Sequence, residues 1–205
     1  MATYSGKSAS DMISSIPGKP GSILRLGRRR WTYDDLREMP ESMERMEIID
    51  GELYMSPSAH VMRHQNAVGN LFFAFRSWVE AHDLGKVFVA PADVVLSQDR
   101  VVQPDVFFVS KERLHTVGAF VSEVPDLVIE VVSPSSAVYD RKTKFALYEE
   151  SGVPEYWLVD PEDQSIDVYA LRENGYEQIG YFTGDEQARS ELLDGFTVEV
   201  DTVFS

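Results

Sequence analysis

The chain of 205 residues contains no cysteine, which excludes a disulfide framework, a thiolate metal site and a cysteine nucleophile. This absence is consistent with a reducing compartment. The sequence also lacks any apolar stretch near the roughly 20 residues that a membrane-spanning helix needs. Its first residues, MATYSGKSASDMISSIPGKPG, lack the apolar centre of a secretory signal. We therefore expect a cytoplasmic protein without a membrane partner.

Basic residues are scarce, with 19 Lys and Arg against 34 Asp and Glu and a net charge of −15. The charged residues are unevenly distributed along the chain. Residues 1–31 carry six basic residues and one acid, whereas residues 150–205 carry two basic residues and 14 acids. Such an acidic body argues against non-specific coating of nucleic acid, which depends on neutralising phosphates. It leaves room for a local site where a metal ion offsets the acids.

Two regions differ in composition. Residues 1–22 are rich in Ser, Gly, Pro and Lys without periodicity, and the basic run LGRRRW follows them. We interpret residues 1–30 as a flexible basic arm, preferring a solvated arm to a phosphate-contacting patch. Residues 31–205 are predicted to form a single domain, because 43% apolar and 11% aromatic residues are typical of a folded protein.

The order of the expected elements predicts an α/β fold. Thr32 can cap a short helix, Asp50-Gly51 predicts a hairpin turn, and residues 60–82 carry an apolar stripe typical of a helix. The strand PDLVIEVVS (125–133) is followed by a helix that ends at Gly152 and then by the strand EYWLVDP, an order that favours a parallel crossover. We expect a central mixed β-sheet flanked by helices.

Two acids interrupt apolar strands. Glu130 lies within PDLVIEVVS, where a carboxylate is costly to bury unless it is paired or coordinated. Asp105 lies within VVQPDVFFVS, which we treat as one strand. If the two strands are neighbours, their acids converge at about 5 Å across the ladder. Two convergent carboxylates suit Mg²⁺ or Mn²⁺, with waters and a substrate phosphate completing the octahedron.

This arrangement resembles the PD-(D/E)xK nuclease superfamily, which has Asp on one strand and Glu-x-Lys on the next. Val132 occupies the position of the lysine here, so the motif is incomplete. The following helix offers a substitute, since Asp140, Lys144 and Tyr148 are spaced i, i+4, i+8 along one face. Lys144 could reach back to Glu130 from that helix.

The resemblance narrows to the Uma2 family of restriction-endonuclease-like proteins. It is carried by the ordered strings WTYDDLREMP, MEIIDGELYMSP, HQ within a helix, VQPDVFFV, PDLVIEVVSPSS, D-x3-K-x3-Y and GVPEYWLVDP. The resemblance implies the restriction-endonuclease-like fold, with Asp105 and Glu130 as metal ligands and Lys144 as the catalytic lysine. It also implies a metal-dependent endonuclease that hydrolyses phosphodiester bonds in DNA.

Several alternatives stay open. Glu47 is either a third acid of the metal shell or a solvent-facing hairpin acid. His64 is favoured as a core histidine, although Gln65 beside it matches the helix motif, so the helix could border the cleft. The competing function is a catalytically inactive binding module in which Glu130 and Lys144 form a structural ion pair, with Lys142 as the less favoured partner. A homodimer is a further option, because two cuts in a duplex suit two copies.

Overall fold

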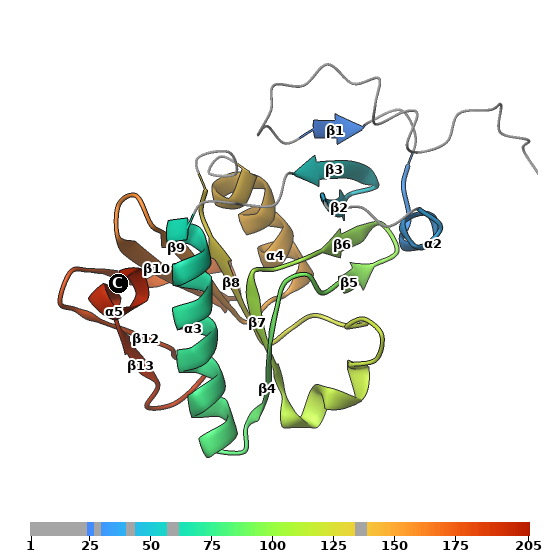
Figure 1. Ribbon diagram of the computed structural model, residues 1–205. Coiled ribbons are helices and arrows are strands. Elements are labelled where there is room, and N and C mark those ends of the chain that lie inside the picture. Colours follow the sequence, from blue (N-terminus) through green and yellow to red (C-terminus); the bar gives the residue numbers. More distant parts are fainter. Residues whose placement is uncertain (1–23, 27–29, 40–43, 57–61, 134–138) are drawn as a thin grey trace, which may run out of the picture.

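A computed structural model describes residues 24–26, 30–39, 44–56, 62–133 and 139–205. The described chain forms a mixed α/β fold in which helices pack against a central sheet, as the sequence predicted (Figure 1). A smaller second sheet lies beside the central one (Figure 1). The N-terminal arm lies outside the described residues, apart from a strand at Leu24–Leu26 and the residue Arg30.

The central sheet has six strands in the order β11-β10-β9-β8-β7-β4. β8 and β9 are parallel, and every other neighbouring pair in this sheet is antiparallel. The predicted parallel crossover between PDLVIEVVS and EYWLVDP is therefore confirmed. The strands are β4 (Gly85–Val89), β7 (Val106–Ser110), β8 (Leu127–Val131), β9 (Glu155–Asp160), β10 (Ser165–Arg172) and β11 (Gly175–Thr183).

Alternation along β8 divides its side chains between two cores. Leu127, Ile129 and Val131 pack into a core with the helix α3 (Met62–Ala81), which confirms the helix predicted at residues 60–82. Val128 packs on the opposite face, in a core that includes the helix α4 (Phe145–Ser151). Glu130 shares the parity of Val128, so its carboxylate is directed toward the α4 side of the sheet.

The second sheet has five strands in the order β1-β3-β2-β6-β5. Its central hairpin turns at Asp50 and Gly51, which have φ angles of 52° and 78°, as a two-residue turn of this type requires. The short helix α2 (Tyr33–Arg37) begins with a capping box at Thr32, as predicted. The strands are β1 (Leu24–Leu26), β2 (Arg45–Ile49), β3 (Glu52–Ser56), β5 (Val94–Ser97) and β6 (Arg100–Val102).

The prediction of a single strand at VVQPDVFFVS is wrong. Its first part is β6 of the second sheet and its second part is β7 of the central sheet, with Pro104 in the connection between them. Proline has no N–H to donate to a ladder, so a change of sheet at this position costs no hydrogen bond. Asp105 consequently lies immediately before β7, where the two sheets meet.

Two further segments complete the crossover and the end of the chain. The crossover begins with a π-helix, η2 (Tyr139–Lys144), before α4, and residues 134–138 between β8 and η2 lie outside the described residues. The chain closes with a strand, β13 (Thr197–Glu199), followed directly by a helix, α5 (Val200–Phe204). The remaining elements are the 3-10 helix η1 (Lys111–Thr116) and the two-stranded sheet of β12 (Gln187–Arg189) and β13 (Thr197–Glu199).

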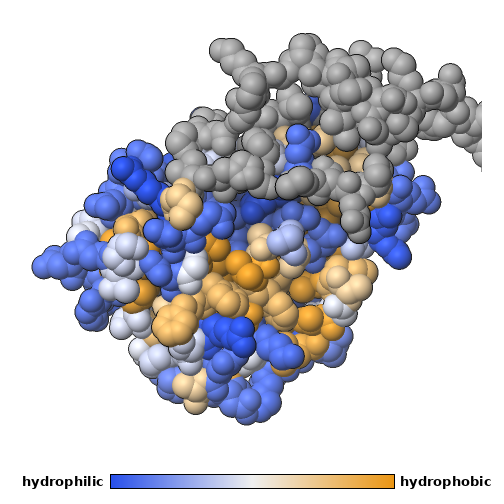
Figure 2. Space-filling model, in the orientation of Figure 1, coloured by the Kyte–Doolittle hydropathy of each residue, from blue (hydrophilic) through white to orange (hydrophobic). Residues whose placement is uncertain are grey.

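On the face that displays α3, apolar side chains gather near the middle with polar side chains around them (Figure 2). Two exposed apolar residues lie on neighbouring elements of the fold, Phe73 on α3 and Val89 on the edge strand β4. Among the described helices, none is long and apolar enough to cross a membrane. The cytoplasmic location and the homodimer stay predictions.

Candidate active site

Asp105 and Glu130 are brought together by the pairing of β7 with β8. These strands are antiparallel, with Val106 opposite Ile129, and one further step of the same register places Asp105 opposite Glu130. The expectation that the two segments are neighbours is thus confirmed, with Asp105 placed just before β7 and not within it. Asp105 is 2% exposed and Glu130 is 1% exposed, so each carboxylate needs partners inside the protein.

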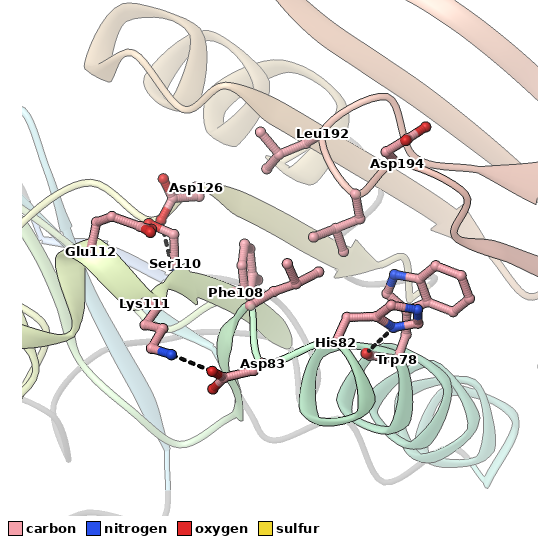
Figure 3. Close-up of a pocket in the computed structure, with 12 residues that line it drawn as sticks. Trp78, His82, Asp83, Phe108, Ser110, Lys111, Glu112, Asp126, Leu192 and Asp194 are labelled. Atoms are coloured by element: carbon pink, nitrogen blue, oxygen red, sulfur yellow. Dashed lines mark hydrogen bonds and ion pairs between the residues drawn. The ribbon is translucent and has the colours of Figure 1, made fainter.

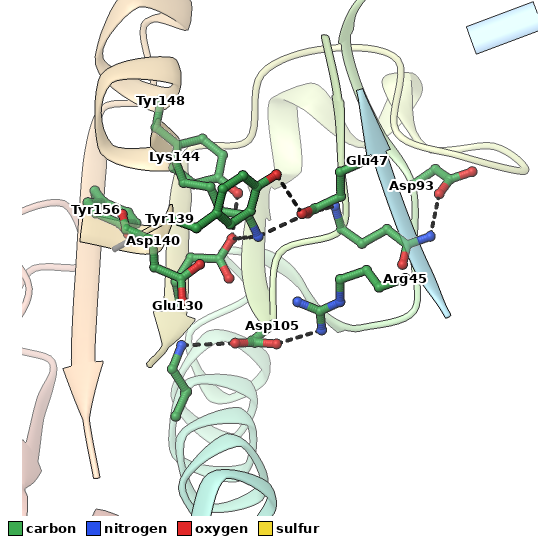
Figure 4. A network of polar contacts seen from close by, with 12 residues as sticks. Arg45, Glu47, Asp93, Asp105, Glu130, Tyr139, Asp140, Lys144, Tyr148 and Tyr156 are labelled. Atoms are coloured by element: carbon green, nitrogen blue, oxygen red, sulfur yellow. Dashed lines mark hydrogen bonds and ion pairs between the residues drawn. The ribbon is translucent and has the colours of Figure 1, made fainter. Parts of the chain in front are cut away.

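Lys144 reaches back over β8 from the crossover (Figure 4). Its Nζ lies 2.8 Å from Glu130 Oε1 and 2.9 Å from Glu47 Oε1. Tyr148, one turn further along the crossover, donates its hydroxyl to the same Glu130 oxygen at 2.6 Å. The predicted approach of Lys144 to Glu130 is confirmed, whereas Lys142 is exposed.

Glu47 joins Asp105, Glu130 and Lys144 in a buried group that we call the carboxylate cluster. Its interpretation as a solvent-facing hairpin acid is therefore wrong. It lies on β2 and is 1% exposed. Besides Lys144, its Oε1 accepts the backbone N–H of Gln103 at 2.9 Å, and its Oε2 accepts the hydroxyl of Tyr139 at 3.1 Å. Glu47 is buried because β2 packs its inner face toward the crossover.

Asp105 has a different set of partners. Its Oδ1 lies 2.7 Å from Arg45 Nη2, and its Oδ2 accepts the backbone N–H of Val131 at 2.9 Å. His64 Nε2 also lies 3.3 Å from Oδ2. This buried histidine therefore lies on the apolar side of α3 and contacts the cluster. Gln65, the next residue, is exposed, and its part in the site stays a prediction.

The charges of the cluster shift its pKa values in opposite directions. Burial would raise the pKa of Asp105, but Arg45, His64 and Lys144 outweigh it and hold this pKa below its usual range. Burial raises the pKa of Glu130, and repulsion from the charges of Asp105, Asp140 and Glu47 raises it as well. The attraction of Lys144 offsets these effects only in part, and the pKa is about 8. The cluster therefore contains more carboxylate charge than its cations neutralise.

Lys144 itself stays charged. Burial lowers the pKa of its ammonium, but the attraction of Glu130, Glu47 and Asp140 is stronger and raises that pKa above its usual value. Burial raises the pKa of Tyr148, and the charge of Glu130 raises it further. The hydroxyl of Tyr148 therefore keeps its proton and remains a hydrogen-bond donor. The site thus holds a permanent cation and a neutral donor against one carboxylate oxygen.

The residues of the cluster fit a divalent cation in their chemistry. Asp105 and Glu130 are hard oxygen donors, and Glu130 retains a proton near neutral pH that a cation could replace. Within the described residues, no group of three or more His, Cys, Asp or Glu side chains is placed to hold a metal. Mg²⁺ is commonly held by one or two carboxylates together with waters and substrate phosphate, so a pair of acids is sufficient.

Sequence reasoning missed Arg45 and gave no role to Tyr139 and Tyr148. Arg45 could have been found, because it lies two residues before Glu47 on β2, and side chains two residues apart on a strand share a face. Tyr148 was placed on the face of Lys144 by its spacing, but nothing local indicated its bond to Glu130. Tyr139 meets Glu47 across 92 positions of sequence, and no local pattern signals such a contact.

A cavity of about 350 Å³ lies at the opposite end of α3, β7 and β8 (Figure 3). Two of its four acids are engaged with neighbours: Asp126 accepts the backbone N–H of Ser110 at 2.8 Å and pairs with Arg113, and Asp83 pairs with Lys111. We therefore place the candidate active site at the carboxylate cluster. The cavity is lined by Trp78, His82, Asp83, Leu84, Phe108, Ser110, Lys111, Glu112, Asp126, Leu192, Leu193 and Asp194.

The mixed α/β fold is shared with a protein of known structure. The structure is similar to the crystal structure of "a putative nuclease belonging to DUF820" from Anabaena variabilis, with a TM-score of 0.73 and 19% identity. The similarity covers 84% of this chain and 97% of that one, which at this identity establishes the common fold.

The chain belongs to the Uma2 family, described as "Putative restriction endonuclease", which matches residues 33–201. The resemblance drawn from the sequence motifs is confirmed. The chain is also similar to "Uncharacterized protein slr1290" of Synechocystis sp., with 30% identity over 102 residues. That match covers 49% of this chain and 53% of the relative, so it spans about half the length of each.

Proposed function

We propose that this protein is a metal-dependent DNA endonuclease that hydrolyses phosphodiester bonds. The observation that carries the proposal is that the buried Asp105 lies opposite the buried Glu130, which shares Lys144 with the buried Glu47 where the two sheets meet. Membership of the Uma2 family supports the nuclease class. The choice of DNA as the substrate comes from the family's description as restriction endonucleases.

Asp105 and Glu130 would hold Mg²⁺ or Mn²⁺, which when bound would polarise the scissile phosphate and lower the pKa of a water. Asp105 is ionised and ready to ligate, since its pKa lies below the usual range. Glu130 must lose its proton, and the ammonium of Lys144 at 2.8 Å favours the ionised carboxylate. Hydrolysis forms a bond from the water oxygen to phosphorus and breaks the bond from phosphorus to the leaving oxygen; the water gives up a proton, and the leaving oxygen takes up a proton from solvent.

Local charge reconciles this activity with an overall charge of −15. Arg45 and Lys144 are cations within the cluster, and a divalent ion would add two positive charges. Electrostatic forces between exposed charges decay over a Debye length, about 8 Å at physiological ionic strength. Acids on distant surfaces therefore weaken the attraction of DNA to this site only slightly.

The test is cleavage of supercoiled plasmid by the full chain with Mg²⁺ or Mn²⁺. The wild type should nick the plasmid, and Asp105→Asn should abolish nicking because a neutral amide is a poor metal ligand. Asp126→Asn is the matched control, since Asp126 precedes β8 as Asp105 precedes β7 but lies at the other end of the sheet. Equal inactivity of the wild type and Asp105→Asn with every metal and substrate would overturn the proposal.

A second candidate function is a non-catalytic binding module on the same fold. It is favoured by the enclosure of Lys144, which is 1% exposed and bridges Glu47 and Glu130 as a structural ion pair would. Calorimetry with Mn²⁺ separates the two functions. Metal binding that disappears in Glu130→Gln supports the endonuclease, and wild-type protein that takes up no metal supports the binding module.

A further inference from the structure

The two permanent cations of the cluster differ in their access to solvent. The side chain of Lys144 is 1% exposed and its Nζ is held by two carboxylates, at 2.8 and 2.9 Å. The side chain of Arg45 is 23% exposed, although its Nη2 contacts the buried Asp105. A phosphate in the backbone of a DNA strand approaches from solvent, so Arg45 can meet it while Lys144 keeps its contacts with Glu47 and Glu130.

Arg45 also contacts the oxygen of Asp105 whose partner can be replaced by a ligand. Oδ2 of that carboxylate is fixed by the backbone N–H of Val131 at 2.9 Å and faces His64 Nε2 at 3.3 Å. Oδ1 is contacted by Arg45 Nη2 at 2.7 Å. Backbone of a central strand cannot move aside, whereas a long, partly exposed arginine can rotate away. A ligand that binds Asp105 would therefore displace Arg45 first.

We propose that Arg45 is the residue that contacts the DNA phosphate at this site. Its guanidinium releases Asp105 Oδ1 when that carboxylate takes a divalent cation, and then donates to oxygens of the phosphodiester. The planar guanidinium suits this task because it presents paired N–H donors that match two phosphate oxygens. Lys144 then acts as a positioning residue, which holds Glu47 and Glu130 in place. This inference rests on the proposed function.

The first test measures DNA binding without cleavage, by fluorescence anisotropy of a short labelled duplex with Ca²⁺ as the metal. Each phosphate contact contributes a slope of about 0.9 to the dependence of log K on log salt. Arg45→Gln should weaken binding and lower this slope by about one contact. A residue that serves the fold alone would leave the slope unchanged. Arg45→Lys should keep the slope and bind more weakly than the wild type, because it loses the paired donors.

Arg113→Gln is the matched control. Arg113 pairs with Asp126 at 3.1 Å and its side chain is 29% exposed, so it repeats the Arg45–Asp105 pair at the other end of β7 and β8. Its slope and duplex affinity should equal those of the wild type. Thermal unfolding of every variant verifies that the fold is retained before the affinities are compared.

Cleavage and metal binding complete the experiment. In the nicking assay Arg45→Gln should raise KM for plasmid, and in calorimetry it should bind Mn²⁺ at least as tightly as the wild type because a competitor for Asp105 is gone. An unchanged salt slope in Arg45→Gln overturns the inference, and so does wild-type protein that binds no duplex. Binding that depends on Arg45 without any cleavage would overturn the endonuclease and leave this inference standing.

Discussion

Replacing Lys144 by methionine tests whether the carboxylate cluster is arranged as described. Methionine keeps much of the apolar stem and removes the ammonium, leaving Glu47 and Glu130 without their shared cation. Removing one partner of a buried ion pair costs about 3–5 kcal/mol. Because two carboxylates lose the same partner, we expect the free energy of unfolding to fall by an amount in the upper part of that range at pH 9.

The loss should be smaller at pH 6. Glu130 has a pKa of about 8 in the wild type, so it is mostly protonated at pH 6 and gains little from Lys144 there. Without the ammonium its pKa rises further, and the variant must either retain the proton or bury a charge. The native variant therefore holds more protons than the wild type above pH 8, so the destabilisation grows as pH rises.

Urea unfolding followed by circular dichroism at pH 6 and pH 9 measures both effects. Arg76→Met is the control, because Arg76 pairs with Glu80 on the exposed face of α3 and such pairs contribute about 1 kcal/mol or less. The double variant Lys144→Met/Glu130→Gln should recover part of the loss at pH 9. A change below about 1 kcal/mol for Lys144→Met at both pH values, or a loss that shrinks as pH rises, would refute the reasoning.

Two other predictions concern buried acids. The wild type should lose stability as pH rises from about 5 to 8, because the native state keeps a proton on Glu130 that the unfolded chain, with a pKa of 4.5, has released; thermal melts of Glu130→Gln should show a flatter dependence, and an identical one would contradict the raised pKa. Glu155 accepts the N–H groups of Glu191 and Leu192 at 2.9 and 2.8 Å and that of the Trp157 indole at 2.7 Å. Glu155→Gln should cost about 1–3 kcal/mol and speed amide exchange at Leu192 without altering plasmid nicking, and unchanged exchange would argue against these bonds.

Much of the site could be predicted from local patterns. The alternation of apolar residues along β8 placed Glu130 on one face, and the spacing of Lys144 and Tyr148 placed them on one side of the crossover. Asp105 was identified as its partner, although the strand assigned to it was wrong in extent. These predictions succeeded because each depends on residues close in sequence or on a single strand pairing.

The environment of these residues could not be predicted in this way. Glu47 was undecided between a buried and an exposed acid, because a hairpin has two faces and the sequence does not say which one another element covers. Arg45 and His64 meet Asp105 from β2 and α3, 60 and 41 positions earlier in the chain. Contacts over such separations leave no periodic signal.

The sequence by itself determined the class of fold, the family and the identity of the acidic pair, since these follow from strand and helix periods and from short ordered motifs. Only the tertiary structure decided which cation is enclosed and which is accessible. Lys144 is buried because the crossover packs over β8 against β2, whereas Arg45 is the first residue of β2 and keeps part of its side chain in solvent. Burial and charge balance depend on all the neighbours at once, and those neighbours come from distant parts of the chain.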